Sequence, residues 1–400
     1  MSIFLTKLNF LFFLLKGLDF IQKSLIKSYN FLLFGMLALF IPFLPVFMKA
    51  QGMSETKVGL LISVGSLITI IVQPTFGMIS DRLKTIRKVM LVLILLTTIS
   101  GFFLYQASSM TWIVIFTLVV YAFLMPLDPL CESLSFTTAE TLKISYGSVR
   151  TYGALGYAVL SLIVGYIMDW FGLHSISYLF AVAGILAFLS VWLLRDAPPS
   201  PVPVTIEGFK KLILNKEILL FLLLILIASI SARMNDTFLG IHVITLNGDN
   251  KLVGLAFFIA AASEIVIFAL SFMWLKPGKE LLLITIAIFF YVVRFFLSGI
   301  VDHPYALIAV QLLQMVTFPI FYTAAIQYLY KLVPREWRAT GQTLLALLFF
   351  GFSGMVTSAI GGYVYNVFGG HNFYFMLTGI SAVAFVYGIF LLIRQKRQTS

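Results

Sequence analysis

The sequence is poor in charged residues and in cysteine. Only 11% of its 400 residues are Asp, Glu, Lys or Arg, and Cys131 is its single cysteine. One cysteine excludes a disulfide or a cysteine-rich metal site within one chain. Soluble globular domains carry about a quarter charged residues. The low charge content therefore excludes an ordinary soluble protein.

Signatures of catalytic and metal sites are also missing. The sequence contains no HExxH, P-loop or GxSxG motif, and its four histidines do not cluster. We therefore predict neither an enzyme nor a bound metal or cofactor. A receptor would normally carry an appended soluble domain, and the longest polar link, residues 196–215, is too short for one. A non-transporting membrane sensor is therefore the least favoured hypothesis.

Apolar residues dominate what is present. They make up 60% of the chain, and the mean hydropathy is +1.03. About twelve apolar runs are each long enough to cross ~30 Å of hydrocarbon. In chain order they cover residues 28–49, 56–79, 88–107, 111–135, 146–168, 173–195, 216–241, 251–275, 279–299, 303–331, 337–362 and 371–394. The sequence predicts an all-α, polytopic membrane protein with about twelve transmembrane helices.

Positive charge is distributed unevenly among the links between these spans. The even-numbered links and the two termini hold about 22 Lys and Arg residues, and the opposite links hold about three, Lys49, Lys57 and Lys251. Lys and Arg mark the cytoplasmic side of a membrane protein. We therefore expect a multi-pass protein of the cell membrane with both termini in the cytoplasm. The net charge of +11 then reflects topology and predicts no nucleic-acid partner.

The longest polar link divides the spans into two sets of six. Its Pro-Pro-Ser-Pro-Val-Pro core cannot cross the membrane as a regular helix. The predicted parts are an N-terminal cytoplasmic or interfacial segment at 1–27, six spans at 28–195, a cytoplasmic linker at 196–215, six spans at 216–394 and a tail at 395–400. The fifth span of each set closes on a similar octapeptide, GYIMDWFG at 165–172 and GYVYNVFG at 362–369. Their matching positions indicate an internal duplication.

Ionisable residues lie inside the apolar spans of the first half. Glu132 in span 4 and Arg150 in span 5 are about equally far from the link between them, so antiparallel helices place them at similar depth. A charge in hydrocarbon costs ~2.5–3.5 kcal/mol, so such residues usually pair and mark a pathway. The alternative is a bridge that only fastens span 4 to span 5. Asp128 is a further acid in the same stretch.

The second half carries another set of polar residues. Arg233 and Asp236, next to Asn235 in span 7, have the i, i+3 spacing that permits a local pair. Glu264 in span 8 and Arg294 in span 9 lie at comparable distances from their link, so they too can meet. The alternative for Arg294 is that its side chain extends to the membrane surface. Span 10 adds three amides that can bond a solute or a neighbouring helix: Gln311, Gln314 and Gln327.

The link between spans 2 and 3 carries a recognisable motif. Residues 73–88, QPTFGMISDRLKTIRK, resemble the signature loop of the major facilitator superfamily. We expect Gly77 to allow close helix contact, Asp81 to meet a helix N-terminus or a neighbouring Arg, and the cations to anchor the loop inside. Where the family usually has a glycine, this chain has Lys84 and Thr85. The resemblance implies a conformational role for four residues: Gly77, Asp81, Arg82 and Arg87.

The order of Glu, Arg, Glu and Arg in spans 4, 5, 8 and 9 is similar to that of the proton-symporter branch that includes lactose permease, nucleoside permeases and phenylpropionate permease. The resemblance covers residues 28–394 and implies the major facilitator fold, two six-helix bundles with a solute site between them. It implies solute binding by Glu132, Arg150 and Glu264. Tyr157 stands where the lactose carriers have a stacking Trp, and the His and Glu of the family's helix 10 are missing.

These patterns define two groups of candidate residues. The predicted solute-binding residues are Glu132, Arg150, Tyr157, Glu264, Arg294, Asp128, Asn235 and Gln314. The predicted proton-coupling residues are Glu264, Asp236 and Glu132, with Asp128 also open. A solute that competes with a carboxylate for an arginine would change the proton affinity of that carboxylate. Solute binding and proton binding would then be coupled.

The preferred hypothesis is import of a small organic solute by proton symport with alternating access. The solute is a sugar, a nucleoside or an aromatic acid, and its partners are protons and the lipid bilayer, with the protein acting as a monomer. The alternative is a proton-coupled exporter of the same superfamily. Such exporters usually show a Gly-Pro signature in the fifth helix, and span 5 here, TYGALGYAVLSLIVGYIMD, has no proline.

Overall fold

The computed structural model describes residues 2–196, 214–333 and 338–399, and every regular element in these ranges is helical. In the first half the helices are α1 (Ser2–Phe40), α2 (Phe43–Ala50), α3 (Glu55–Leu83), α4 (Ile86–Gln106), α5 (Met110–Leu124), α6 (Leu127–Thr141), α7 (Tyr146–Phe171) and α8 (Ile176–Leu193). In the second half they are α10 (Lys216–Thr245), α11 (Asn250–Ala269), α12 (Ser271–Trp274), α13 (Glu280–Ile300), α14 (Pro304–Val310), α15 (Phe318–Leu332), α16 (Arg338–Ala346) and α17 (Ser353–Thr399).

The predicted all-α membrane fold is confirmed. Across the described ranges, 11 helical runs are long and apolar enough to cross a membrane. The last, Gly341–Arg397, has 57 residues, more than twice the length that one crossing needs. Gly369 interrupts it with φ 76° and ψ 173°, a conformation that favours glycine. This one run therefore contains the last two predicted spans.

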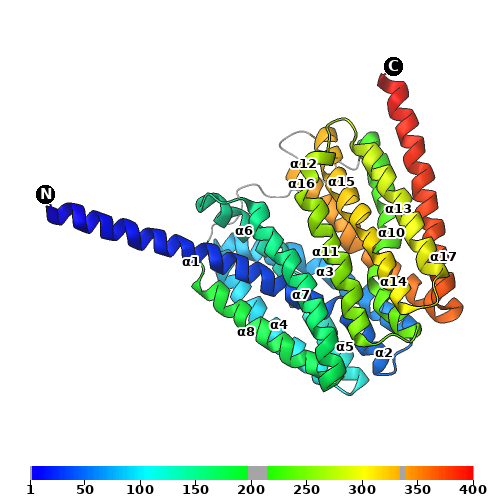
Figure 1. The fold of residues 1–400 in the computed structure, drawn as a ribbon, viewed down its shortest axis with the longest axis horizontal. Coiled ribbons are helices and arrows are strands. Elements are labelled where there is room, and N and C mark those ends of the chain that lie inside the picture. Colours follow the sequence, from blue (N-terminus) through cyan, green and yellow to red (C-terminus); the bar gives the residue numbers. More distant parts are fainter. Residues whose placement is uncertain (1, 197–213, 334–337, 400) are drawn as a thin grey trace.

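Several predicted boundaries change where the helices break. The first span breaks between α1 and α2 beside Pro42, because proline removes a backbone donor. The eighth span, predicted to reach residue 275, ends at Ala269, and the Trp274 indole donates back to the Ile267 carbonyl at 3.1 Å. The N-terminal segment continues into the first span as one helix, α1, which extends beyond the packed helices (Figure 1). The linker lies almost entirely outside the described residues.

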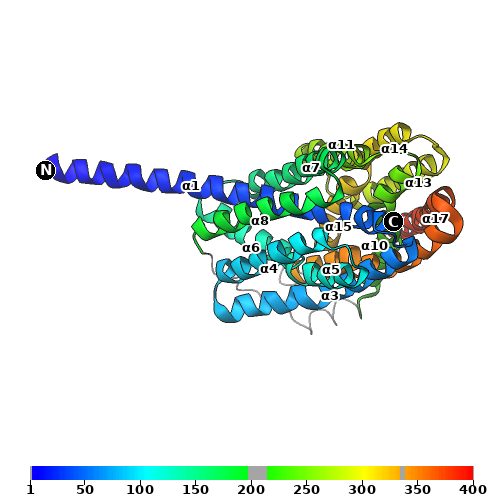
Figure 2. The same ribbon diagram turned by 90° about the horizontal axis from the view of Figure 1, so that it is seen from below.

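The helices form two bundles, one from each half of the chain (Figures 1 and 2). In the N-terminal bundle, α1 packs on α7 and α8, and α4 packs on α5 and α8. In the C-terminal bundle, α17 packs on α10 and α13, and α15 packs on α13. The bundles meet mainly where α3 contacts α17 and where α7 contacts α11.

These contacts concentrate toward one end of the bundles. We call it the cation-poor end, because it carries Lys49, Lys57 and Lys251, and we call the opposite end the cation-rich end. A Cβ on Gly59 of α3 would lie 2.1 Å from the Ser358 carbonyl oxygen of α17, so glycine is required for this approach. The Ser63 hydroxyl donates to the Met355 carbonyl at 2.5 Å. The two bundles are therefore closed against each other at the cation-poor end.

Asp169 of α7 forms a polar contact between the bundles at the same end. Its carboxylate accepts from the backbone N–H groups of Asn250 at 3.3 Å and Lys251 at 3.2 Å, and from the Asn250 amide at 2.9 Å. The Lys251 ammonium lies 3.7 Å away. A carboxylate is favourable at a helix N-terminus, where backbone N–H groups lack partners. Asp169 therefore caps α11 from the opposite bundle.

Replacing Asp169 with alanine is expected to weaken this closure, because hydrogen bonds to a charged group contribute about 1.5–3 kcal/mol each. In a Cys131→Ser background, spin labels at the exposed positions Phe171 and Tyr305 report the separation of the bundles. Asp169→Ala should shift the distance distribution to longer values. Asp302→Ala changes an exposed aspartate of the same end and serves as the control. Equal distributions in all three proteins would contradict the role of Asp169.

Candidate solute-binding site

The predicted pair of Glu132 and Arg150 is present. The Arg150 Nε atom lies 2.9 Å from Glu132 Oε1, and the side chains are 34% and 40% exposed for Glu132 and Arg150, respectively. The link after α6 reverses the chain, so α6 and α7 place both residues at the same depth. The Arg150 guanidinium also lies 4.0 Å from the centre of the Phe34 ring of α1, within the range of a cation–π contact. Three helices thus position this arginine.

The pair faces the opposite bundle. Tyr322 of α15 lies within electrostatic reach of Asp128, Glu132 and Arg150. Asp128 precedes Glu132 by one helical turn, and it too lies within reach of Arg150. The partial exposure of the pair, together with the nearby tyrosine from the other bundle, places these charges where the N-terminal bundle faces the C-terminal bundle.

A glutamine bridges the predicted pair in the C-terminal bundle. Arg294 Nη1 donates to Gln314 Oε1, and Gln314 Nε2 donates to Glu264 Oε1 at 2.5 Å. The expected direct contact between Glu264 and Arg294 is thus replaced by an amide, which carries both a donor and an acceptor. Arg294 is only 2% exposed, which excludes extension to the membrane surface.

Local backbone geometry explains how two amides reach one arginine. Residues Gln311–Val316 form a 3-10 turn, in which side chains three residues apart eclipse each other. Gln311 and Gln314 therefore point the same way, and Arg294 Nη2 donates to Gln311 Oε1 at 2.5 Å. The guanidinium is held by two amides at once, a geometry that lysine cannot reproduce.

The local pair predicted in α10 is also present. Arg233 Nη1 lies 2.8 Å from Asp236 Oδ2. Asp236 is within electrostatic reach of Arg294. Asn235 is 1% exposed and accepts from the Tyr374 hydroxyl at 3.2 Å. Asn235 therefore packs against α17, and its side chain also interacts with the neighbouring candidate Asp236.

The charges of the two bundles act on one another. Arg150 lies within electrostatic reach of Glu264, and Tyr157 of α7 lies within reach of Asp236, Arg233 and Glu264. The structure therefore brings most candidates together between the bundles: Asp128, Glu132, Arg150, Tyr157, Asp236, Glu264, Arg294 and Gln314. The sequence analysis missed Phe34, Tyr322 and the role of Arg233. Tyr322 follows Gln314 by about two turns in the same span, a spacing that could have indicated it.

The motif loop is held by Arg87, one of the four expected residues, together with Asp196. A Cβ on Gly77 would have no atom within 4 Å, so this glycine makes no close helix contact. Asp81 is exposed. The Arg87 guanidinium donates to the Leu194 carbonyl at 2.8 Å, and the Asp196 carboxylate accepts from the Arg87 backbone N–H at 3.0 Å. Lys84 has φ 52° and ψ 36°, the left-handed conformation that glycine usually supplies.

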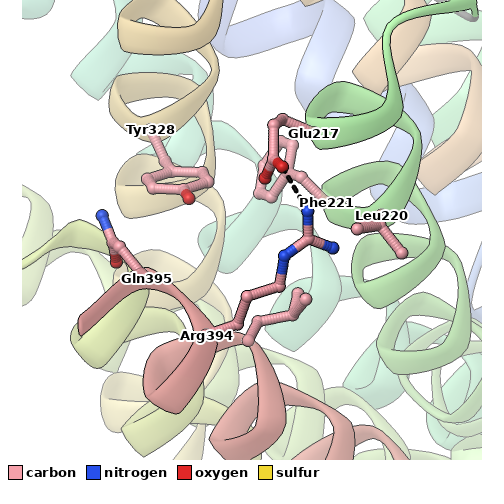
Figure 3. A pocket seen from close by; sticks show the side chains of 7 residues that line it. Glu217, Leu220, Phe221, Tyr328, Arg394 and Gln395 are labelled. Carbon is pink, nitrogen blue, oxygen red and sulfur yellow. Dashed lines mark hydrogen bonds and ion pairs between the residues drawn. The ribbon is translucent and has the colours of Figure 1, made fainter. Parts of the chain in front are cut away.

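Two hollows lie outside this site. One, at the start of α10 and the end of α17, has a volume of about 30 Å³ and contains the Glu217–Arg394 ion pair beside Tyr328 (Figure 3). This volume suits about one water. The other, about 410 Å³, is a groove between the links at 246–249 and 302–305. Neither hollow is lined by any of the candidate residues that lie together between the bundles.

Comparison with known proteins shows what the chain resembles. A family model described as "MFS_1 like family" matches residues 24–376. The chain is 25% identical over 362 residues to the "Uncharacterized transporter YwbF" of Bacillus subtilis, covering 90% of each chain. It is 23% identical over 346 residues to a maltose permease of Geobacillus stearothermophilus, covering 86% of this chain and 88% of that one.

A solved structure agrees on the fold. The crystal structure of the nucleoside transporter NupG superposes with a TM-score of 0.81 at 16% identity, covering 93% of this chain and 99% of that one. The two-bundle arrangement of helices is therefore shared over nearly the whole length of both proteins.

Proposed function

Because the chain belongs to the MFS_1-like family of transporters, we propose that it imports a small organic solute together with a proton. The solute class is a sugar, a nucleoside or an aromatic acid. The observation that carries the proposal is the hydrogen-bonded series Arg294, Gln314 and Glu264, which lies across from Arg150. Ionisable residues in membrane spans are rare and mark solute or proton pathways. Similarity to a maltose permease supports a solute rich in hydroxyls.

In this mechanism the same site binds both the solute and the proton. A solute hydroxyl that bonds Gln314 or Arg294 competes with the bonds that these groups make in the empty site. Glu264 then loses its amide donor and can accept a hydrogen bond from the solute instead. A solute that also engages Arg150 removes the cation that favours the ionised form of the nearby carboxyl groups, so solute binding and proton binding favour each other, which is the thermodynamic requirement for symport.

Alternating access exposes the site to one side at a time. In this form α3, α7, α11 and α17 close the cation-poor end. Helix α6 packs on helices of its own bundle and α16 packs on α15, which supports an opening toward the cation-rich end. We place the protein in the cell membrane with both termini in the cytoplasm, which makes the form inward-facing, and we propose that it acts as a monomer.

The test is a proton-uptake experiment. Cells that express the protein are de-energised and lightly buffered, and sugars, nucleosides and aromatic acids are added in turn while external pH is recorded. We expect a pH rise with one solute class, because protons enter with the solute. The rise should disappear in Glu264→Gln. Glu280→Gln provides the matched control, because Glu280 pairs with Lys331 at 2.6 Å at the cation-rich end.

A folded wild-type protein that takes up a solute of the panel without any pH rise would overturn proton symport. A pH fall on solute addition would instead identify exchange of solute for protons.

A further inference from the structure

When all its ionisable residues are charged, the site has no net charge in the C-terminal bundle but a net negative charge in the N-terminal bundle. The C-terminal bundle contributes two acids and two bases: Asp236, Glu264, Arg233 and Arg294. The N-terminal bundle contributes two acids and one base: Asp128, Glu132 and Arg150. With every group ionised, the second set carries one surplus negative charge. An uncompensated charge between apolar helices is unfavourable, and a proton on one acid of this set would remove the surplus.

Helix geometry makes the two acids a unit. Asp128 and Glu132 are four residues apart in α6, so their side chains lie on the same face, one turn apart. Glu132 is paired with Arg150 at 2.9 Å, and Asp128 lies within electrostatic reach of that same arginine. When two carboxyl groups interact strongly, the protons that they bind belong to the pair and not to either residue.

A buried hydroxyl points to where the proton resides. Tyr29 of α1 is 0% exposed, its hydroxyl oxygen has no hydrogen-bond partner, and it lies within electrostatic reach of Asp128. Of the two acids, Asp128 is thus the one near a buried hydroxyl that makes no hydrogen bond, whereas Glu132 is paired with Arg150. The titratable or charged groups that face the two acids come from four helices: Tyr29, Cys131, Arg150 and Tyr322.

We propose that Asp128 and Glu132 share the proton that travels with the solute, so that Asp128 serves proton binding instead of the solute binding expected from the sequence, whereas Glu264 serves solute binding. The inference rests on the proposed symport and assigns its proton site to the N-terminal bundle. Loading adds a proton from water to a carboxylate oxygen, and unloading returns it to water, without a change in any bond of the solute. A solute that engages Arg150 removes the compensating charge from the acids. The pair then retains its proton for as long as the solute is bound.

The test compares exchange with accumulation in proteoliposomes that contain the purified full-length protein, with the solute identified by the proton-uptake panel. Exchange of labelled for unlabelled solute requires no net proton movement. Accumulation driven by a pH difference gives about tenfold enrichment per pH unit at one proton per solute. Asp128→Asn should retain exchange and lose the pH-driven enrichment. Asp236→Asn is the matched control in the other bundle, and it should reduce exchange as well, because it removes the partner of Arg233.

The outcomes separate the two proposals. A wild-type protein that exchanges solute but shows no pH-driven enrichment overturns the proposed symport itself. A coupled wild type together with a fully coupled Asp128→Asn variant overturns only the proton assignment. If Asp128→Asn does not exchange solute, the infrared carboxylic-acid band of the folded wild-type protein at neutral pH decides. A band that Tyr29→Phe shifts supports the shared proton, and the lack of such a band overturns it.

Discussion

Replacing Arg294 with leucine is expected to abolish transport and to destabilise the C-terminal bundle. The change leaves the acceptor oxygens of Gln311 and Gln314 without their donor in a buried position, and it removes a positive charge that acts on Glu264. Removing one partner of a buried charged network costs about 3–5 kcal/mol. Solute exchange in proteoliposomes and thermal unfolding of the purified protein measure the two effects.

Arg294→Lys separates charge from geometry. Lysine restores the positive charge, but its single ammonium group cannot reproduce the planar arrangement in which the guanidinium donates to two amides at once. We expect this variant to recover part of the lost stability and little of the transport. Wild-type exchange in Arg294→Leu would show that the bridge through Gln314 is dispensable for solute binding.

Replacing Gly59 with leucine is expected to prevent closure of the cation-poor end. Any side chain at this position collides with backbone, because a Cβ would lie 2.1 Å from the Ser358 carbonyl oxygen. Helices α3 and α17 must therefore separate, and the transport cycle stops with that end open. A cysteine at position 63, in the Ser63→Cys, Cys131→Ser background, reports the opening by its reaction with a membrane-impermeant maleimide added outside. We expect little reaction in the parent and fast reaction after Gly59→Leu.

The control places the same side chain where it meets no atom. Gly379 is exposed, and a Cβ there has nothing within 4 Å, so Gly379→Leu should leave both reactivity and transport unchanged. A Gly59→Leu protein that keeps full transport and an unreactive thiol would mean that the bundles do not close through this contact.

Composition and periodicity were sufficient to predict the membrane fold. Apolar runs of the length of the bilayer have few alternatives, because every backbone polar group must be satisfied within the helix. The pair of Glu132 and Arg150 was predictable for a related reason, since equal distances from a short link translate directly into equal depth. Depth along adjacent helices can be counted from the sequence, and these two helices are adjacent.

The remaining features depend on geometry that residue counting does not give. Glu264 and Arg294 lie at comparable depths, yet a 3-10 turn places Gln314 between them. The turn contains no proline or glycine from which it could have been predicted. Lys84 adopts the left-handed conformation because the end of α3 and the start of α4 require a reversal there, whatever residue occupies it. The capping of α11 by Asp169 joins helices from opposite bundles, whose approach no local pattern encodes.

The difference between the two octapeptides has a consequence for the order of events during opening. Asp169 in the first copy corresponds to Asn366 in the second, and Asn366 is exposed. The boundary between α7 and α11 is thus held by charge-assisted bonds, and that between α3 and α17 by neutral ones from Thr56 and Ser63. We expect the α3 and α17 boundary to part first, while the α7 and α11 boundary acts as a pivot until Asp169 releases α11. An internal duplication of equal halves would then produce an asymmetric, stepwise motion.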